Sequence, residues 1–251
     1  MLEKDLQLNQ TIENFTLILP SISVGNAGQL AVDYLIHYLK ATKSHQLWHD
    51  GVLPVVGKNP FDENSAALGL PVEVFVSAAH KLVLVQIRSP ILKKLESNFL
   101  SELIDFFQVR KIKQTIILSS LFAQNRTDAQ LVDKLERYIA CPVTLKNSKS
   151  DFDRLHWKCL EQFSSADGTL NLSGAGFSKK AFKLCQTKNM PCLILFKFCA
   201  DGDNIPDAID LVSFLDSWLH LTSFKDKNSY GCKTPPSWKF LFGIPGPKEI
   251  W

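Results

Sequence analysis

The sequence has 251 residues, of which 45% are hydrophobic and 21% are charged, and its formal net charge is +3. This composition is typical of a globular chain and excludes the disordered and fibrous classes. The nearly even charge balance also argues against a dedicated nucleic-acid binder, which usually carries a strongly basic face. We expect a single domain over residues 1–251, long enough to bury a sizeable core.

Six cysteines lie in the second half of the chain, with no C-x-x-C pair and no spacing typical of zinc ligands. Neither a disulfide scaffold nor a metal site is therefore expected, and the reducing cytoplasm and nucleus are the expected location. The first residues lack the apolar stretch of a secretory signal. No window reaches the roughly 18 consecutive apolar residues that a membrane helix needs, so no membrane contact is expected.

The first expected unit is a strand, a turn of small residues and a helix. Residues 15–19 form an almost continuous apolar run ended by Pro20, the pattern of a strand that is buried on both faces. Small residues follow at 21–28, and apolar residues then recur at helical spacing from Gln29 to about Lys40. A strand, a turn and a helix in this order open a βαβ unit.

The next segments predict a hairpin and a long helix. Residues 46–49 are a weaker strand candidate. Two β-rich runs at 72–76 and 82–88 are joined by a short connection, which predicts an antiparallel hairpin. Pro90 is expected to open a helix whose apolar face extends to Phe107.

The middle of the chain is predicted to contain one strand and one helix. Residues 115–118 are a buried strand candidate. The helical spacing of Leu131, Leu135 and Tyr138 predicts a helix over 128–138.

The rest of the chain divides into an irregular part, an ordered part and a tail. Loop-forming residues interrupt the segment at about 143–178, which predicts an insertion or a mobile segment. The wider stretch of about 123–190 lacks the ordered motif matches described below and is expected to be a divergent insertion. A strand is predicted at 192–199, followed by a helix that begins at about Asn204 and carries Pro206 in its first turn. Residues 234–251 form an aromatic C-terminal tail.

Buried strands that alternate with amphipathic helices, together with one antiparallel hairpin, predict a three-layer α/β/α sandwich with a Rossmann-like, mostly parallel sheet.

A helix that follows a turn of small residues presents free backbone N–H groups to an anion, which makes the turn at 25–28 a nucleotide-site candidate. Only Gly25 and Gly28 fit the dinucleotide pattern, and no Walker lysine follows. Glycine here serves close helix–strand packing equally well. A nucleotide- or nucleoside-binding enzyme is thus the alternative function.

No other motif predicts a reaction centre. Residues 174–176 favour a flexible turn, and the acidic loop at 201–204 lacks the glycine and glutamate of a calcium-binding loop. The histidines are dispersed, and a G-x-S-x-G serine-hydrolase motif is absent. Short lysine and arginine clusters fit solvated helix faces better than an RNA groove. Catalytic residues, cofactors and metals are therefore not predicted.

The aromatic tail allows two interpretations. Trp238, Phe242, Ile250 and Trp251 can pack back on the chain's own sheet, or they can anchor the tail in a pocket of a partner. We retain these four as candidate partner-binding residues.

Several segments, in order along nearly the whole chain, resemble the proteasome assembly chaperone 2 family. They are residues 19–31 (with Val24, Gly25, Asn26, Gly28 and Gln29), 52–60 (with Gly57), 86–89, 202–208 (with Asn204 and Pro206) and 235–243. The resemblance implies a Rossmann-like domain that acts without catalysis, as a heterodimer with proteasome assembly chaperone 1. Such a pair would hold α-subunits while the α-ring of the 20S proteasome forms.

The resemblance also implies a possible role for the C-terminus. Some members of this chaperone pair end in a hydrophobic residue, a tyrosine and any third residue, and that tail inserts between α-subunits. The last three residues here are Glu249, Ile250 and Trp251, so the sequence departs from the pattern at the tyrosine.

Overall fold

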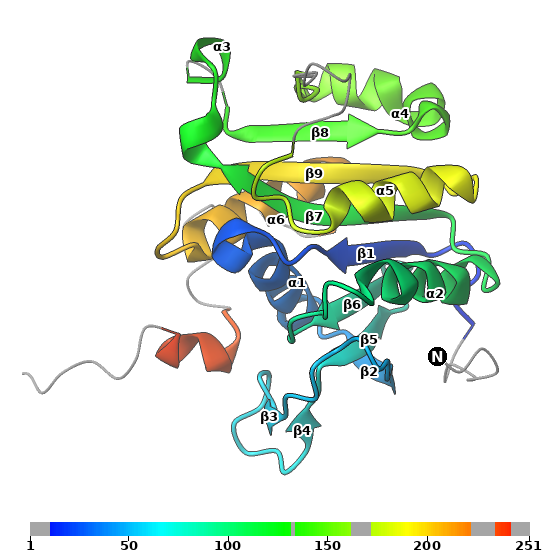
Figure 1. Cartoon of the computed structure of the whole chain (residues 1–251), viewed down its shortest axis with the longest axis vertical. Helices are drawn as coiled ribbons and strands as arrows, with labels where there is room; N and C mark the ends of the chain where they lie inside the picture. Colours follow the sequence, from blue (N-terminus) through cyan, green and yellow to red (C-terminus); the bar gives the residue numbers. More distant parts are fainter. Residues whose placement is uncertain (1–10, 132–133, 162–171, 222–233, 242–251) are drawn as a thin grey trace, which may run out of the picture.

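A computed structural model describes residues 11–131, 134–161, 172–221 and 234–241. Its centre is a seven-stranded sheet in the order β2-β5-β6-β1-β7-β9-β8 (Figure 1). The strands are β1 (Thr16–Pro20), β2 (Thr42–Gln46), β5 (Val72–Ser77), β6 (Leu82–Ile87), β7 (Gln114–Phe122), β8 (Glu136–Ala140) and β9 (Cys192–Cys199). Strands β6, β1, β7 and β9 are parallel, whereas β5, β2 and β8 run antiparallel to their neighbours.

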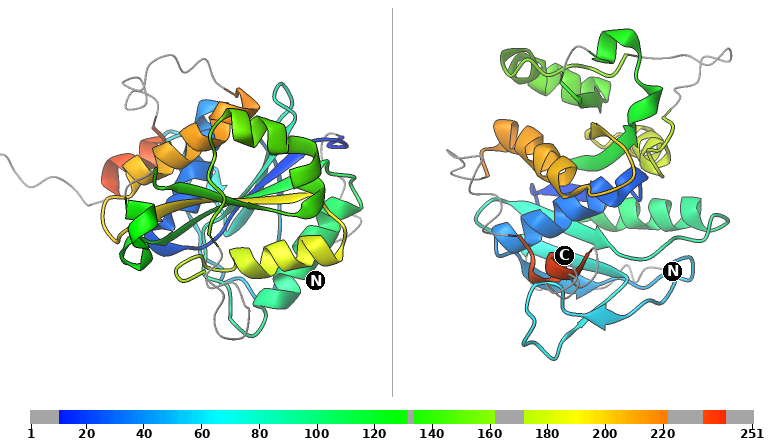
Figure 2. Two further views of the ribbon diagram at one scale, coloured as in Figure 1. Left: turned by 90° about the horizontal axis from the view of Figure 1, so that it is seen from above. Right: turned by 90° about the vertical axis from the view of Figure 1, so that its left-hand side faces the viewer.

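Helices cover both faces of the sheet (Figure 2). One face carries α1 (Ala27–Tyr38), α4 (Pro142–Arg154) and α6 (Ile205–Leu219), and the other carries α2 (Glu96–Gln108) and α5 (Ser178–Thr187). Smaller elements are η1 (Val24–Asn26), the β3–β4 ladder (Gly57–Lys58 and Leu68–Gly69), η2 (Ala123–Asn125), α3 (Asp128–Leu131) and η4 (Pro236–Phe240). The predicted three-layer α/β/α sandwich with a mostly parallel sheet and a β5–β6 hairpin is confirmed.

The central strands consist of apolar runs because both of their faces are covered. Every residue of β1 and β9 is buried. Along β1, Leu17 and Leu19 pack on the α2–α5 side, whereas Ile18 packs on the α1–α6 side. Alternate side chains of one strand thus join two separate apolar cores, and a polar residue on either face would be buried.

Two predicted helices differ from the structure. The helix predicted over 128–138 is wrong beyond Leu131, because residues 136–140 form β8 along the free edge of β9. The helix predicted from Pro90 begins only at Glu96, because the residues before it pair with residues 51–53. The weak strand predicted at 46–49 lies earlier in the chain, as β2. Residues 123–190 contain β8, α4 and α5, which belong to the three layers.

Within the described ranges, none of the helices has the length and apolar character needed to cross a bilayer. The five cysteines in this part of the chain are free thiols. These residues also contain no group of three His, Cys, Asp or Glu side chains placed to hold a metal ion.

Candidate functional site

The sequence motifs meet where the chain reverses its winding across the sheet. The parallel strands follow one another as β1, β6, β7 and β9, but they lie in the order β6-β1-β7-β9. In doubly wound sheets, ligands bind in the crevice at the carboxyl ends of the strands at such a reversal, here between β1 and β7. Val24, Gly25 and Asn26 form η1, which follows β1 after three residues, and Asn204 lies in the turn after β9.

The chain itself fills this crevice. Residues 172–177, which we call the plug, lie across the ends of β1 and β7. The Val24 N–H donates to the carbonyl of Gly174 over 2.8 Å. The hydroxyls of Ser21 and Ser119 both donate to the carbonyl of Ala175, over 2.7 and 3.1 Å. The position that a bound ligand takes in related architectures is therefore occupied by backbone of the same chain.

The motif glycines are required for close packing. Gly25 has a φ of +64°, and a Cβ there would lie 2.5 Å from the side chain of Asn204. A Cβ at Gly28 would lie 2.3 Å from the carbonyl oxygen of Leu118 in β7. Both approaches leave no room for any larger residue, so these glycines bring η1 and α1 onto the sheet. This is the packing role that the sequence offered as the alternative to phosphate binding.

Asn204 connects the first turn of α6 to the end of β9. It is buried, and its amide donates to the carbonyl of Ala200 over 2.8 Å and to the carboxylate of Asp207 over 3.0 Å. Burial raises the pKa of Asp207, although the hydrogen bond from Asn204 acts in the opposite direction. Pro206 lies in the first helical turn, where a missing N–H costs no hydrogen bond. Asn204 thus holds the turn against which Gly25 packs.

Gln29 connects α1 to β6. Its amide donates to the carbonyl of Ile87 over 2.7 Å, and the amide of Gln86 donates to the Gln29 carbonyl over 2.8 Å. Next to this pair, Arg88 makes two hydrogen bonds to the Asp33 carboxylate, of 2.7 and 2.9 Å. Burial alone would lower the pKa of Arg88, but its acidic neighbours outweigh burial and raise it. These contacts give the motif residues a structural role, since they join α1 to β6.

A second feature, the arm, comprises residues 48–70 and projects below β2 and β5 (Figure 1). It begins with a short pairing to the chain before α2: Val52 pairs with Ile91, and the Leu92 N–H donates to the carbonyl of Gly51 over 2.7 Å. It continues into the two-residue β3–β4 ladder. Gly57 lies here, is exposed, and has nothing within 4 Å of a Cβ position, so packing does not require a glycine.

Two side chains anchor the arm: buried His49 at its start and half-buried Phe61 near its middle. At its start, Nδ1 of His49 accepts the Gly51 N–H over 2.9 Å, so Nε2 carries the proton and donates to Asn98 over 2.8 Å. Farther along, the ring of Phe61 stands edge-on to Phe75, with ring centroids 5.5 Å apart. The arm is therefore held in one place although little of it is buried.

The arm and the segment before α2 together carry most of the exposed apolar side chains. Ten large apolar side chains are exposed in the described residues. Six of them, between 38% and 56% exposed, form what we call the apolar patch: Trp48, Leu53, Val55, Val56, Leu68 and Leu92. Three of the six, Leu53, Val55 and Val56, lie in the segment 52–60 that carries part of the family resemblance.

The start of the tail packs on the chain itself. Trp238 is buried, with its ring centroid 6.2 Å from that of Tyr34, and the Ser237 N–H donates to the carbonyl of Pro60 over 3.2 Å. This is the first of the two interpretations of the tail. Phe242, Ile250 and Trp251 lie outside the described residues. Partner binding by these residues and by Trp238 stays a prediction.

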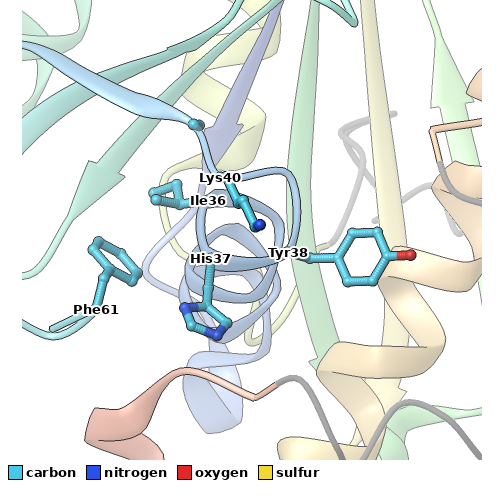
Figure 3. Close-up of a pocket in the computed structure, with 6 residues that line it drawn as sticks. Ile36, His37, Tyr38, Lys40 and Phe61 are labelled. Atoms are coloured by element: carbon cyan, nitrogen blue, oxygen red, sulfur yellow. The ribbon is translucent and has the colours of Figure 1, made fainter.

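An open pocket lies between the end of α1 and the arm (Figure 3). Its described lining consists of Ile36, His37, Tyr38, Lys40, Ala41 and Phe61. Burial lowers the pKa of His37. Among the described lining residues, none carries a carboxylate, a hydroxyl of serine or a thiol beside His37.

The comparisons with known proteins agree on one family. The PAC2 family model matches residues 17–201. The chain is similar to proteins named proteasome assembly chaperone 2 from Danio rerio (36% identical, 93% of each chain covered) and Homo sapiens (32% identical, 96% of each covered). It shares its fold with Pyrococcus furiosus PbaA, described as an archaeal homolog of proteasome-assembly chaperone (TM-score 0.67, 14% identity, covering 89% of this chain and 91% of PbaA). The chain therefore belongs to the PAC2 family.

Proposed function

We propose that this protein is a chaperone for assembly of the 20S proteasome, acting by binding and not by catalysis, in the cytoplasm and nucleus. The observation that carries the proposal is the full-length similarity to relatives named proteasome assembly chaperone 2, of which 93–96% is covered. The family model's match over 17–201 spans the plug, the arm and β8 as well as the central strands.

The finer part of the proposal concerns the partners. The protein pairs with proteasome assembly chaperone 1, and the pair holds α-subunits while the α-ring forms. Support comes from the ordered motif resemblance and from the exposed apolar patch, because large contiguous apolar patches mark interaction surfaces. The filled crevice supports binding over catalysis, since its polar groups bond to the plug.

A pull-down from cells that are assembling proteasomes tests this proposal. The tagged full chain is expressed, and co-purifying proteins are identified by mass spectrometry, with the tag alone as the control. We expect proteasome assembly chaperone 1 and α-subunits to be enriched over the control. Absence of 20S α-subunits from the precipitate contradicts the proposal.

A ligand screen tests the alternative function. If the chain were a nucleotide- or nucleoside-binding enzyme, nucleotides or phosphate would raise its melting temperature by several degrees. We expect no shift, because the plug occupies the crevice. Gly25→Val cannot serve as the control here, since a side chain at this φ would clash with Asn204 whether or not a ligand binds. Lys40→Ala, in the open pocket, is the suitable comparison.

A further inference from the structure

The apolar patch draws its residues from the arm and from the segment before α2. The antiparallel Val52–Ile91 pairing places Leu53 opposite Pro90 and Leu92 opposite Gly51, so both belong to the paired segment at the base of the arm. In the β3–β4 ladder, Lys58 lies opposite Leu68. Val55 and Val56, which precede the ladder directly, are 53% and 51% exposed, and Leu68 in the ladder is 56% exposed.

Trp48, the aromatic member of the patch, is also exposed. Trp48 lies between two buried residues, Leu47 and His49, and is itself 56% exposed. The anchored His49 fixes the backbone on one side of it. A large, rigid aromatic side chain held on the surface by a buried neighbour has the character of an interface anchor.

The patch is large enough to form the centre of a stable interface. Its six side chains expose on the order of 600 Å², which is about the largest apolar patch of a typical monomer and most of the ~800 Å² that one partner buries in a standard complex. The arm itself has a ladder of only two residue pairs. Such a ladder needs further packing to be stable, and the apolar patch lies where that packing can be added.

We infer that the apolar patch is the surface on which the partner chaperone of the proposed heterodimer docks. This inference rests on the proposed function and adds the surface that pairing uses. The apolar character of the patch favours the permanent partner chaperone over an α-subunit, because long-lived interfaces are more apolar than transient ones. An α-subunit, the client that is later released, is expected to meet a more polar surface. The occupant is thus a second folded subunit that presents an apolar face.

Matched double variants test the assignment. Val56→Asp with Leu68→Asp places two charges on the patch. Val143→Asp with Leu131→Asp is the control, because its residues have nearly the same exposure (49% and 56%, against 51% and 56%) and lie away from the arm. Each tagged full chain is co-expressed with proteasome assembly chaperone 1, and the recovered partner is quantified. We expect recovery to fall by about tenfold or more for the patch variant and to stay unchanged for the control.

Further measurements keep the outcomes distinct. The patch variant should melt within about 2 °C of the unmodified chain, since exposed substitutions rarely alter stability. Should it fail to fold, Trp48→Ala, which adds no charge, takes its place. If the unmodified chain recovers no partner, the result contradicts both the proposed function and this inference. If it recovers the partner and the patch variant does so equally, only the surface assignment is overturned.

Two other results would also overturn the assignment. A patch variant that loses α-subunits but retains the partner chaperone would show that the patch binds the client. If the unmodified chain alone is a dimer in solution and the patch variant is a monomer, the occupant is a second copy of the chain.

Discussion

The two edge strands of the sheet differ in whether backbone hydrogen bonds cover their outer edges. At one end, residues 158–160 cover β8: the Tyr138 N–H donates to the carbonyl of Lys158 over 3.0 Å, and the Leu160 N–H donates to the carbonyl of Tyr138 over 2.9 Å. At the other end, no strand among the described residues pairs with the outer edge of β2, and the arm projects beside it. An uncovered edge invites another chain, whereas a covered edge prevents such pairing.

The aromatic residues follow the same division. At the covered end, Phe152, Trp157, Phe214 and Trp218 pack together, with ring centroids between 4.1 and 6.0 Å apart. At the open end, Trp48 lies largely on the surface. The covered end thus completes its own core, while the open end keeps apolar surface available. This asymmetry indicates that the open end, next to β2, is the end suited to contact the proposed partner.

The largest expected effect contrasts one aromatic residue from each end. Phe152→Ala removes a fully buried ring that stacks 4.9 Å from Trp157, and we expect it to lower the free energy of unfolding by about 3–5 kcal/mol. Trp48→Ala removes an exposed ring and should change that free energy by no more than about 0.5 kcal/mol. Urea denaturation measures both. Similar losses for the two variants would contradict the proposed difference between the ends.

A smaller effect should follow from uncovering β8. Leu160→Pro removes the N–H that bonds to Tyr138, whereas Leu160→Ala shortens the same side chain and keeps the N–H. We expect the proline variant to be about 1–3 kcal/mol less stable than the alanine variant. It should also self-associate in light scattering, because the β8 edge becomes available. If the two variants behave alike, the backbone cover does not protect the edge.

The smallest effect concerns pH at the same cover. Burial acts to raise the pKa of Glu161, but the hydrogen bond that Gln130 donates over 2.6 Å and the nearby charge of Arg137 outweigh burial, so the pKa is lowered. A carboxyl whose pKa is lower in the folded state adds stability above its unfolded pKa and loses it as the pH falls through the folded pKa. Because Glu161 is half exposed, its contribution should stay below about 1 kcal/mol.

Glu161→Gln should therefore be less stable than the unmodified chain at pH 7, and the gap should close toward pH 3. Denaturation at both pH values measures the gap. Glu63→Gln, an exposed carboxylate on the arm, is the control and should show no gap at pH 7. A gap for Glu161→Gln that is the same at both pH values would exclude the ionised carboxylate as its cause.

Part of the fold could be predicted from the sequence because local patterns decide it. The apolar runs of β1 and β9 have the composition of strands covered on both faces, and the start of α6 carries its own signals in Pro206 and Asp207. Residues 128–138 misled the prediction because Leu131, Leu135 and Tyr138 also fit a helical spacing. Residues 136–140 form a strand because they pair with the open edge of β9, and no local sequence pattern reveals that edge.

The sequence identified Gly25, Gly28 and Asn204 as motif residues, but it did not show how they pack. Gly25 lies against Asn204, whereas Gly28 lies against Leu118 of β7. Their tight packing depends on contacts between distant parts of the chain: Ser21 bonds to the plug at Ala175, 154 residues away. The apolar patch escaped prediction for a similar reason, since composition shows that residues are apolar but not that they are exposed.

The plug has a consequence for how the amount of folded protein is controlled. A domain whose crevice binds a free small molecule gains stability as that molecule's concentration rises. Here the occupant is part of the chain, so its local concentration is fixed by its covalent attachment. Stability at this position is then independent of metabolite levels. If the proposed partners bind the outer surface, their supply is then what varies the fraction of folded protein.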